Sequence, residues 1–153
     1  MVDTLTRAQR SALMSRVRSA GNVSTELRLI AVFRDLGVTG WRRGINVTFM
    51  SGEKPFKVSP DFVFRSRRMA VFVDGCFWHG CPRHAVQPKT RVRFWRDKIA
   101  GNRARDRRVT RVLQTHGWRV LRVWEHELAP KHANRLANRL RRVGLTGLKR
   151  SPA

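Results

Sequence analysis

The sequence predicts an α/β fold in which a mixed sheet is flanked by helices. Three observations support this: apolar residues at helical spacing after position 24, two short apolar runs on either side of residues 65–68, and a helix followed by a strand over 90–124. A chain of 153 residues with 41% hydrophobic content has room for one core. We expect a single domain over 21–145, with a basic arm (1–20) before it and a frayed tail (146–153) after it.

The first predicted helix spans residues 24–36. Ser24 is a suitable N-cap, and Gly37 is typical of the residue that follows a helix. Its apolar residues share one face: Leu27, Ile30, Phe33 and Leu36. This segment should therefore cover one side of the sheet.

The region 41–73 has the composition of strands. Residues 41–49 predict a strand, followed by a turn at Ser51 and Gly52. The apolar runs 58–64 and 69–73 are joined by a short charged segment, so we expect an antiparallel hairpin.

The second half of the chain predicts a loop over 74–89, a helix over 90–115 and a strand over 118–124, with a break in the helix near Gly101. A basic helix over 131–143 completes the order. A strand that follows a crossover helix is expected to pair in parallel with an earlier strand. The ends of 69–73 and 118–124 should then lie side by side, with Asp74 near His126.

The charge balance indicates a polyanionic partner. The chain has 33 Lys and Arg against 10 Asp and Glu, a formal net charge of +23. A face this basic gains affinity for nucleic acid by releasing counterions, and the alternative is a solvated or membrane-attracted surface. The sequence has neither an apolar stretch long enough to span a membrane nor a signal peptide at its start, so we expect a cytoplasmic location, at the nucleoid if the partner is DNA.

Acidic residues are scarce, and two of them adjoin apolar strands. Asp61 lies within the predicted strand 58–64, and Asp74 follows 69–73. Carboxylates at neighbouring strand ends are suitable Mg²⁺ ligands, although a lone aspartate there is more often a turn or capping residue. Glu26 in a first helical turn also favours the helix dipole. His79 has three readings: general base, zinc ligand or ordinary loop histidine.

Cysteines and histidines gather in the loop 74–89. A zinc site needs four ligands, and the set that we favour is Cys76, Cys81, His84 and His126. Competing sets would use His79 or His116, and a disulfide between the two cysteines is the less favoured alternative in a reducing compartment. The sequence predicts a structural zinc that ties the loop to the end of strand 118–124.

Aromatic residues flank this loop in polar or basic surroundings. Phe77 and Trp78 lie in a glycine-rich segment, and Trp95 lies among arginines. Such side chains can wedge between base pairs, most easily at a mismatch. The alternative, above all for Trp95, is packing in the core.

Five motifs in order resemble the very-short-patch repair endonucleases, which share the restriction-endonuclease core. The resemblance covers about residues 5–128 and rests on these segments: TRAQRSALMSRVRSAGNVSTELRLI, PDFVF, VFVDGCFWHGCP, FWRDKIAGNRARDRR and GWRVLRVWEHE. It implies a Mg²⁺-dependent enzyme that nicks double-stranded DNA on the 5′ side of the thymine in a T:G mismatch left by deamination of 5-methylcytosine.

The resemblance also implies roles for individual residues. Asp61 and the backbone carbonyl of Val73 match the metal ligands, His79 matches the histidine that activates the attacking water, and Glu26 matches a glutamate that positions water at the metal. Phe77, Trp78 and Trp95 match the wedging aromatics. Met14 matches an apolar residue of the arm that enters the opposite groove.

The motifs depart from the family pattern at two places. Asp74 stands where the pattern has histidine, which leaves its catalytic role open, and His126 replaces a cysteine in a shorter zinc loop. The resemblance further implies a monomer linked to a cytosine-5 DNA methyltransferase and to a repair polymerase and ligase. Two rivals remain: a non-catalytic zinc-containing DNA-binding module, and a restriction endonuclease on the same core.

Overall fold

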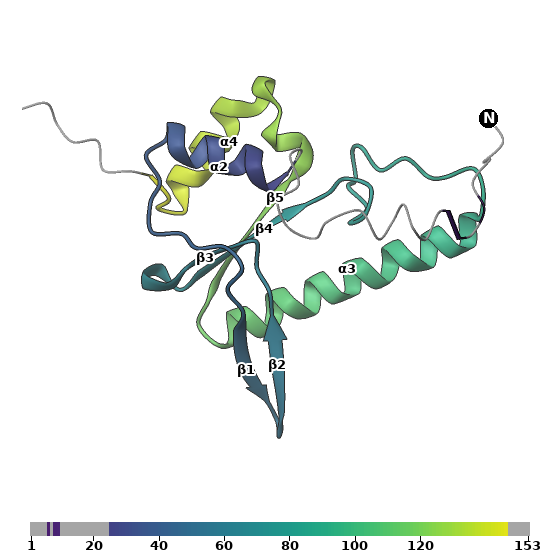
Figure 1. Cartoon of the computed structure of the whole chain (residues 1–153), viewed down its shortest axis with the longest axis horizontal. Helices are drawn as coiled ribbons and strands as arrows, with labels where there is room; N and C mark the ends of the chain where they lie inside the picture. Colours follow the sequence, from purple (N-terminus) through teal and green to yellow (C-terminus); the bar gives the residue numbers. More distant parts are fainter. Residues whose placement is uncertain (1–5, 7, 10–24, 147–153) are drawn as a thin grey trace, which may run out of the picture.

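The computed structural model describes residues 6, 8, 9 and 25–146. Around the middle of the chain lies a three-stranded sheet, with helices on both of its faces and a separate hairpin at one side (Figure 1). Most of the expected arm (1–20), Met14 included, lies outside the described residues, as do the expected N-cap Ser24 and residues 147–153 of the expected tail.

The sheet is mixed, as the sequence predicts. Its order is β3 (Phe62–Phe64), β4 (Met69–Asp74) and β5 (Arg119–Trp124). β3 pairs antiparallel with β4, and β4 pairs in parallel with β5 in a register that sets Val71 opposite Leu121. The two strand ends that hold Asp74 and Trp124 are thus adjacent.

The period-2 alternation of the strands divides their side chains between two helical layers. On one face α2 (Glu26–Asp35) and α4 (Ala133–Arg142) cover the sheet, and on the other lies α3 (Val92–Thr115) (Figure 1). The first face has the larger core, with these fully or almost fully buried members: Leu29, Phe33, Phe62, Phe64, Met69, Val71, Val123, Leu136 and Leu140. Ala70 and Leu113 belong to the smaller core under α3.

Helix α3 runs without interruption over 24 residues, so the alternative of a break near Gly101 is not what the chain adopts. An isolated glycine inside a helix costs only about 1 kcal/mol relative to alanine, less than a long packed helix gains. The C-terminal end of α2 agrees with the prediction, since Gly37 follows the helix with a positive φ of 65° and donates its N–H to the Arg34 carbonyl, whereas the helix begins at Glu26. In the last helical segment, the first turn from Pro130 is 3₁₀ and α4 begins at Ala133.

The strand bounds between 41 and 64 differ from expectation. Two strands, β1 (Val47–Ser51) and β2 (Lys54–Val58), form a hairpin whose turn includes Gly52 with φ 65°. The strand expected at 41–49 is wrong over 41–46, where Arg42 makes only an isolated bridge to Val63.

The strand expected at 58–64 is confirmed over Phe62–Phe64, which pairs antiparallel with β4 as the hairpin prediction requires. It is wrong over 59–61, because β2 ends at Val58 and β3 begins at Phe62. Pro60 cannot donate to a sheet ladder, and it lies in the break between the two strands. Asp61 is therefore in the linker that enters β3 rather than inside a strand.

In the described part of the chain, no helix has the length and apolarity that a membrane span requires.

Candidate active site

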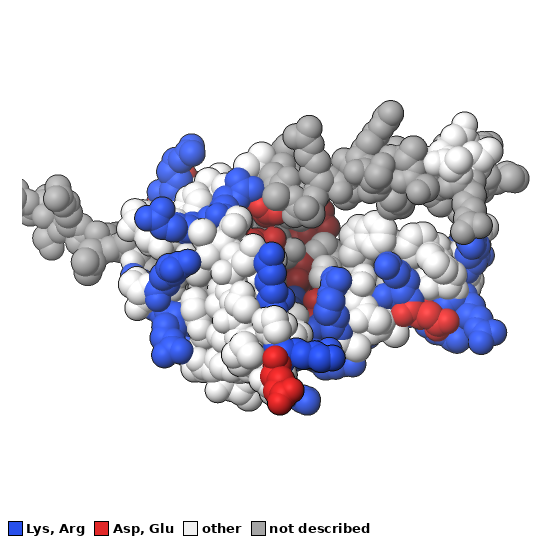
Figure 2. Space-filling model, turned by 60° about the horizontal axis from the view of Figure 1, so that its bottom comes forward, with Lys and Arg blue, Asp and Glu red and all other residues white. Residues whose placement is uncertain are grey.

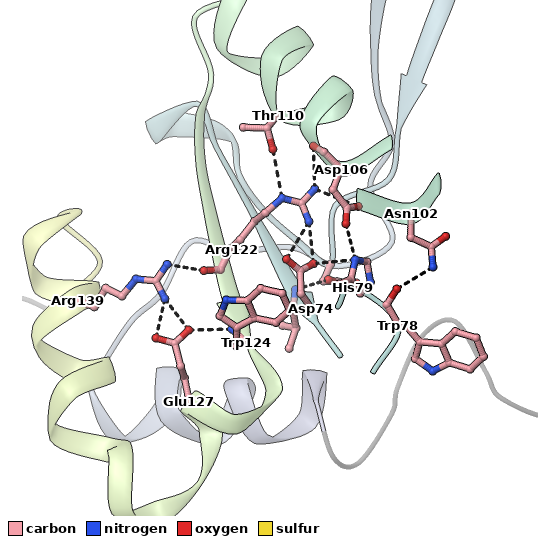
Figure 3. Close-up of polar contacts among 12 residues, drawn as sticks. Asp74, Trp78, His79, Asn102, Asp106, Thr110, Arg122, Trp124, Glu127 and Arg139 are labelled. Atoms are coloured by element: carbon pink, nitrogen blue, oxygen red, sulfur yellow. Dashed lines mark hydrogen bonds and ion pairs between the residues drawn. The ribbon is translucent and has the colours of Figure 1, made fainter. Parts of the chain in front are cut away.

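Three residues from two elements and a loop converge beyond the carboxyl end of β4. Asp74 ends that strand and is 5% exposed, His79 lies in the loop that follows, and Asp106 projects from α3 (Figure 3). The His79 Nδ1 lies 2.5 Å from Asp106 Oδ2 and 3.8 Å from Asp74 Oδ1. We call Asp74, His79 and Asp106 the carboxylate–histidine cluster.

Arg122 of β5 lies against this cluster. Its Nη1 donates to both Asp74 oxygens, at 2.7 and 3.0 Å, and its Nη2 lies 3.5 Å from Asp106 Oδ1. Neither Asp106 nor Arg122 is among the site residues predicted from the sequence. The available signal was an arginine inside an apolar strand, since a charge there needs a partner.

Asp61 lies at the edge of the same region. Its Oδ2 accepts the backbone N–H of Val73 at 2.7 Å. Burial raises the pKa of Asp61 from 3.8 to about 6, the hydrogen bond from Val73 opposes this rise, and the negative charges of Glu26 and Asp74 add to it. A carboxylate that is costly to ionise, close to a backbone strand end and other carboxylates, fits a divalent cation, which would compensate its charge.

Glu26 lies in the first turn of α2, as the sequence predicts. It is 5% exposed, and Arg43 forms an ion pair with its Oε2 at 2.5 Å. Its charge acts on Asp61. Glu26 thus belongs to the surroundings of Asp61 as well as to the helix start.

The pKa of Asp106 shows how the carboxylate–histidine cluster is balanced. Burial raises this pKa, but the hydrogen bond and positive charge of His79, together with Arg122 and Arg105, lower it by more, so the net shift is downward. Asp106 is therefore a carboxylate that stays ionised beside the histidine. Such a partner orients an imidazole and stabilises its protonated form.

The cysteines and histidines expected to bind zinc also come together. The Nδ1 of His126 lies 3.3 Å from Cys76 Sγ and 3.6 Å from Cys81 Sγ, and Cys81 Sγ lies 3.7 Å from His84 Nδ1. One ligand atom from each of these residues lies within 4.8 Å of the others. We call Cys76, Cys81, His84 and His126 the thiol–imidazole cluster.

The alternatives to this cluster find other partners. His79 belongs to the carboxylate–histidine cluster, and the His116 ring packs 4.4 Å from that of Phe49. Both cysteines are free thiols. The favoured set of the sequence analysis is therefore the set that the fold assembles.

Local hydrogen bonds hold the thiol–imidazole cluster in shape. Glu125 Oε2 accepts the Cys76 N–H at 3.2 Å, and Glu127 accepts both the Trp124 N–H at 2.8 Å and the Arg139 guanidinium (Figure 3). Burial raises the pKa of the Cys76 thiol to about 11, and Cys81 adds to that rise. Two buried thiols and two imidazoles at these distances fit a tetrahedral metal ion, which would favour the thiolate forms.

The three expected wedge aromatics pack on one another. Ring centroids are 5.2 Å apart for Phe77–Trp78, 5.2 Å for Phe77–Trp95 and 5.8 Å for Trp78–Trp95. All three are half-buried, and none is among the members of the two cores of the described residues. Asn102 binds the Trp78 carbonyl at 2.8 Å, and the indole points away from His79 (Figure 3).

On the face shown in Figure 2, the two signs of charge are separated. Most acidic side chains on the face in Figure 2 gather in a hollow near its middle, and Lys and Arg surround them. Such an arrangement suits a polyanion, because the surrounding Lys and Arg attract its phosphates.

Comparison with known proteins gives a consistent result. The family model described as DNA mismatch endonuclease Vsr matches residues 2–85. Type II nicking enzyme V.XorIIP of Xanthomonas oryzae pv. oryzae is 39% identical over 145 residues, 94% of this chain and 97% of that protein. DNA mismatch endonuclease Vsr of Escherichia coli is 37% identical over 82% of this chain and 74% of its own length.

Another relative has a higher sequence identity over a shorter stretch. Type II nicking enzyme V.NaeI of Lentzea aerocolonigenes is 58% identical over 71 residues, which span 46% of this chain and 43% of that protein. The family resemblance inferred from the five motifs is confirmed, and the mixed sheet flanked by helices is compatible with a restriction-endonuclease-like fold. The chain belongs to the Vsr family of DNA endonucleases.

Proposed function

We propose that this enzyme nicks double-stranded DNA on the 5′ side of the thymine in T:G mismatches and so starts very-short-patch repair. The observation that supports this most is the pairing of His79 with Asp106 close to Asp74, because it places a base next to a region suited to a metal. A non-catalytic DNA-binding module would need no such pair.

Asp61 and the backbone carbonyl of Val73 are the proposed Mg²⁺ ligands. When bound, Mg²⁺ would neutralise charge that develops on the scissile phosphate. The contact between Asp61 and the Val73 N–H keeps the carboxylate next to this strand end. Glu26 orients water near Asp61.

His79 takes the proton from the attacking water. The water oxygen forms a bond to phosphorus while the bond from phosphorus to the leaving sugar oxygen breaks. Asp106 holds the imidazole by its Nδ1 and stabilises the positive charge that His79 acquires. Asp74 completes the negative surroundings of the histidine.

Zinc in the thiol–imidazole cluster is proposed as a structural cofactor. It would hold the loop 74–89 against the turn after β5 and thereby fix the position of His79, which lies between Cys76 and Cys81. We propose no chemical step for this metal.

Phe77, Trp78 and Trp95 are proposed to wedge into DNA beside the mismatch, and Met14 of the arm (1–20) to enter from the opposite groove. A T:G pair costs less to unstack than a matched pair, so wedging selects it. We further propose a single domain over 21–145 with a tail over 146–153, which acts as a monomer at the nucleoid. Its substrate is DNA that a cytosine-5 methyltransferase has modified, and a polymerase and a ligase complete the repair after the nick.

Single-turnover cleavage at saturating enzyme tests the proposal. The substrates are a T:G duplex, the matched C:G duplex and the matched T:A duplex, and a nick confined to the thymine strand of the first is the expected result. Cleavage of both strands of a matched duplex would favour a restriction endonuclease, and binding without any cleavage would favour a DNA-binding module.

Two variants test the assigned residues in the same assay. Asp61→Asn should abolish nicking while it leaves DNA binding intact or stronger, and His79→Ala should lower the rate by roughly 10² to 10⁴. Asp97→Asn is the control, since Asp97 is an exposed acid of α3 paired only with Arg96 in the described residues. Wild-type rates from folded Asp61→Asn protein would contradict the assignment.

A further inference from the structure

Arg122 occupies a central position between the sheet and α3. It lies opposite Phe72 in the parallel register of β4 and β5, and its guanidinium lies 4.5 Å from the Phe72 ring centroid. The alternation of strand side chains directs both residues toward α3. The side chain is about one-fifth exposed, so its charge is largely removed from water.

The hydrogen bonds of Arg122 use the whole guanidinium fork. Nη1 donates to both oxygens of Asp74, Nε donates to Thr110 Oγ1 at 3.2 Å, and Nη2 reaches the backbone oxygen of Asp106 at 3.4 Å and its Oδ1 at 3.5 Å (Figure 3). Two of these partners, Asp106 and Thr110, belong to α3. A planar fork makes such contacts simultaneously, whereas a lysine ammonium cannot.

The charges explain why the fork matters here. Asp74 and Asp106 both approach His79, and like charges this close repel one another. Arg122 contacts both carboxylates, and thus joins the strand that leads into the His79 loop to the helix that orients His79. It is therefore the element that fixes the distance between these two acids.

We infer that Arg122 is a positioning residue for the nicking reaction, which holds Asp106 in the orientation that aligns His79 and uses Asp74 as its counter-ion. This inference rests on the proposed function. Under this inference, Asp74 serves as the counter-ion of Arg122 and does not act directly on the phosphate. A displacement of about 1 Å in a reacting group can cost 10² in rate, so a residue that touches no substrate can still govern the chemical step.

The test uses Arg122→Met and Arg122→Lys in the single-turnover T:G assay, with Arg119→Met as the matched control. Arg119 lies on the same strand, but its guanidinium binds the Val143 carbonyl, away from the cluster. Arg122→Met should lower the rate by roughly 10² while DNA affinity changes by less than about threefold. Arg122→Lys should recover only part of the loss, because it restores charge without the fork.

Coupling to His79 separates positioning from a general loss of structure. In a His79→Ala background, Arg122→Met should lower the residual rate by less than about twofold, because there is no histidine left to align. In the double variant Asp74→Asn/Arg122→Met, which removes both partners, the melting temperature should return toward that of the wild type while the rate stays low.

The outcomes are distinct. A wild-type enzyme that does not nick the T:G duplex overturns the proposed function and this inference with it. If the wild type nicks but Arg122→Met retains its rate, or loses equally in the His79→Ala background, only the role of Arg122 is overturned.

Discussion

The thiol–imidazole cluster and the carboxylate–histidine cluster, which both include residues of the loop 74–89, differ in how the charges of their side chains are compensated. In the thiol–imidazole cluster, burial raises the pKa of Cys76 to about 11, and Cys81 and Glu125 add to that rise. In the carboxylate–histidine cluster, Arg122 already pairs with Asp74 and approaches Asp106. The first cluster therefore depends on a metal ion to become charged, whereas the second is balanced by the protein itself.

The comparison also separates stability from chemistry. A metal that ties a loop to a strand end contributes to folding, because its ligands are assembled only in the folded chain. A cluster that is balanced by an arginine can lose one member and still fold. Substitutions in the two clusters should then differ in what they damage, and the predictions below test that difference.

The largest effect is expected from Cys76→Ala. Removal of one ligand should release the metal and lower the free energy of unfolding by about 4 kcal/mol or more, which corresponds to roughly 10 °C in Tm. Thermal unfolding and elemental analysis measure this, with about one zinc per wild-type chain expected after dialysis. His79→Ala is the control from the other cluster and should lower Tm by less. Folded wild-type protein without zinc would contradict the prediction.

Asp61 should show the next effect, as a dependence of stability on pH. Its pKa rises from 3.8 to about 6 on folding, so the folded chain binds this proton more tightly than the unfolded chain. The resulting stabilisation is complete below pH 3.8 and is lost as the pH rises through 6, a change of roughly 3 kcal/mol. Mg²⁺ should offset the loss above pH 6.

The measurement compares wild type with Asp61→Asn by denaturant unfolding in Mg²⁺-free buffer. Relative to the variant, the wild type should lose roughly 2.4 kcal/mol between pH 4 and pH 7, which is most of the full change. This difference cancels the contributions of the other carboxylates, including Asp106, whose pKa shifts the other way. If the free energy of unfolding changed with pH in the same way for both proteins, the pKa of Asp61 would not be raised by folding and the prediction would be contradicted.

Much of the site could be predicted from the sequence because its motifs are local. Cys76, His79 and Cys81 lie within six residues, and the parallel pairing of β4 with β5 follows from the helix between them. Asp106 and Arg122 were missed because their roles depend on how α3 packs on the sheet, which is a long-range contact. Pro60 interrupts the strand expected at 58–64, so Asp61 lies before β3 and not within it, and β2 over Lys54–Val58 was not predicted.

Gly80 lies between His79 of one cluster and Cys81 of the other, and its substitution should have a smaller effect on both stability and nicking rate. It has φ +61°, and a Cβ there would lie 2.7 Å from Ile99 Cγ2 of α3. Gly80→Ala should lower stability by about 2 kcal/mol and the nicking rate by roughly tenfold, because His79 is the preceding residue. Gly52→Ala is the matched control, since Gly52 has φ +65° with no atom within 4 Å of a Cβ. Equal losses in the two variants would mean that backbone strain alone matters.

The smallest effect on stability is expected from Trp78→Ala. This variant tests whether the Trp78 side chain serves mismatch recognition or packing in the core. Trp78 is half-buried and contacts Phe77 and Trp95, so its loss should cost only about 1 kcal/mol. Trp41→Ala is the control, because Trp41 packs on Phe33 and Phe62 of the main core and should cost more. The preference of Trp78→Ala for T:G over matched duplex should fall by roughly tenfold, since the wedge no longer selects the weaker stack. Unfolding of Trp78→Ala, with full T:G preference in any folded fraction, would place this side chain in the core and contradict wedging.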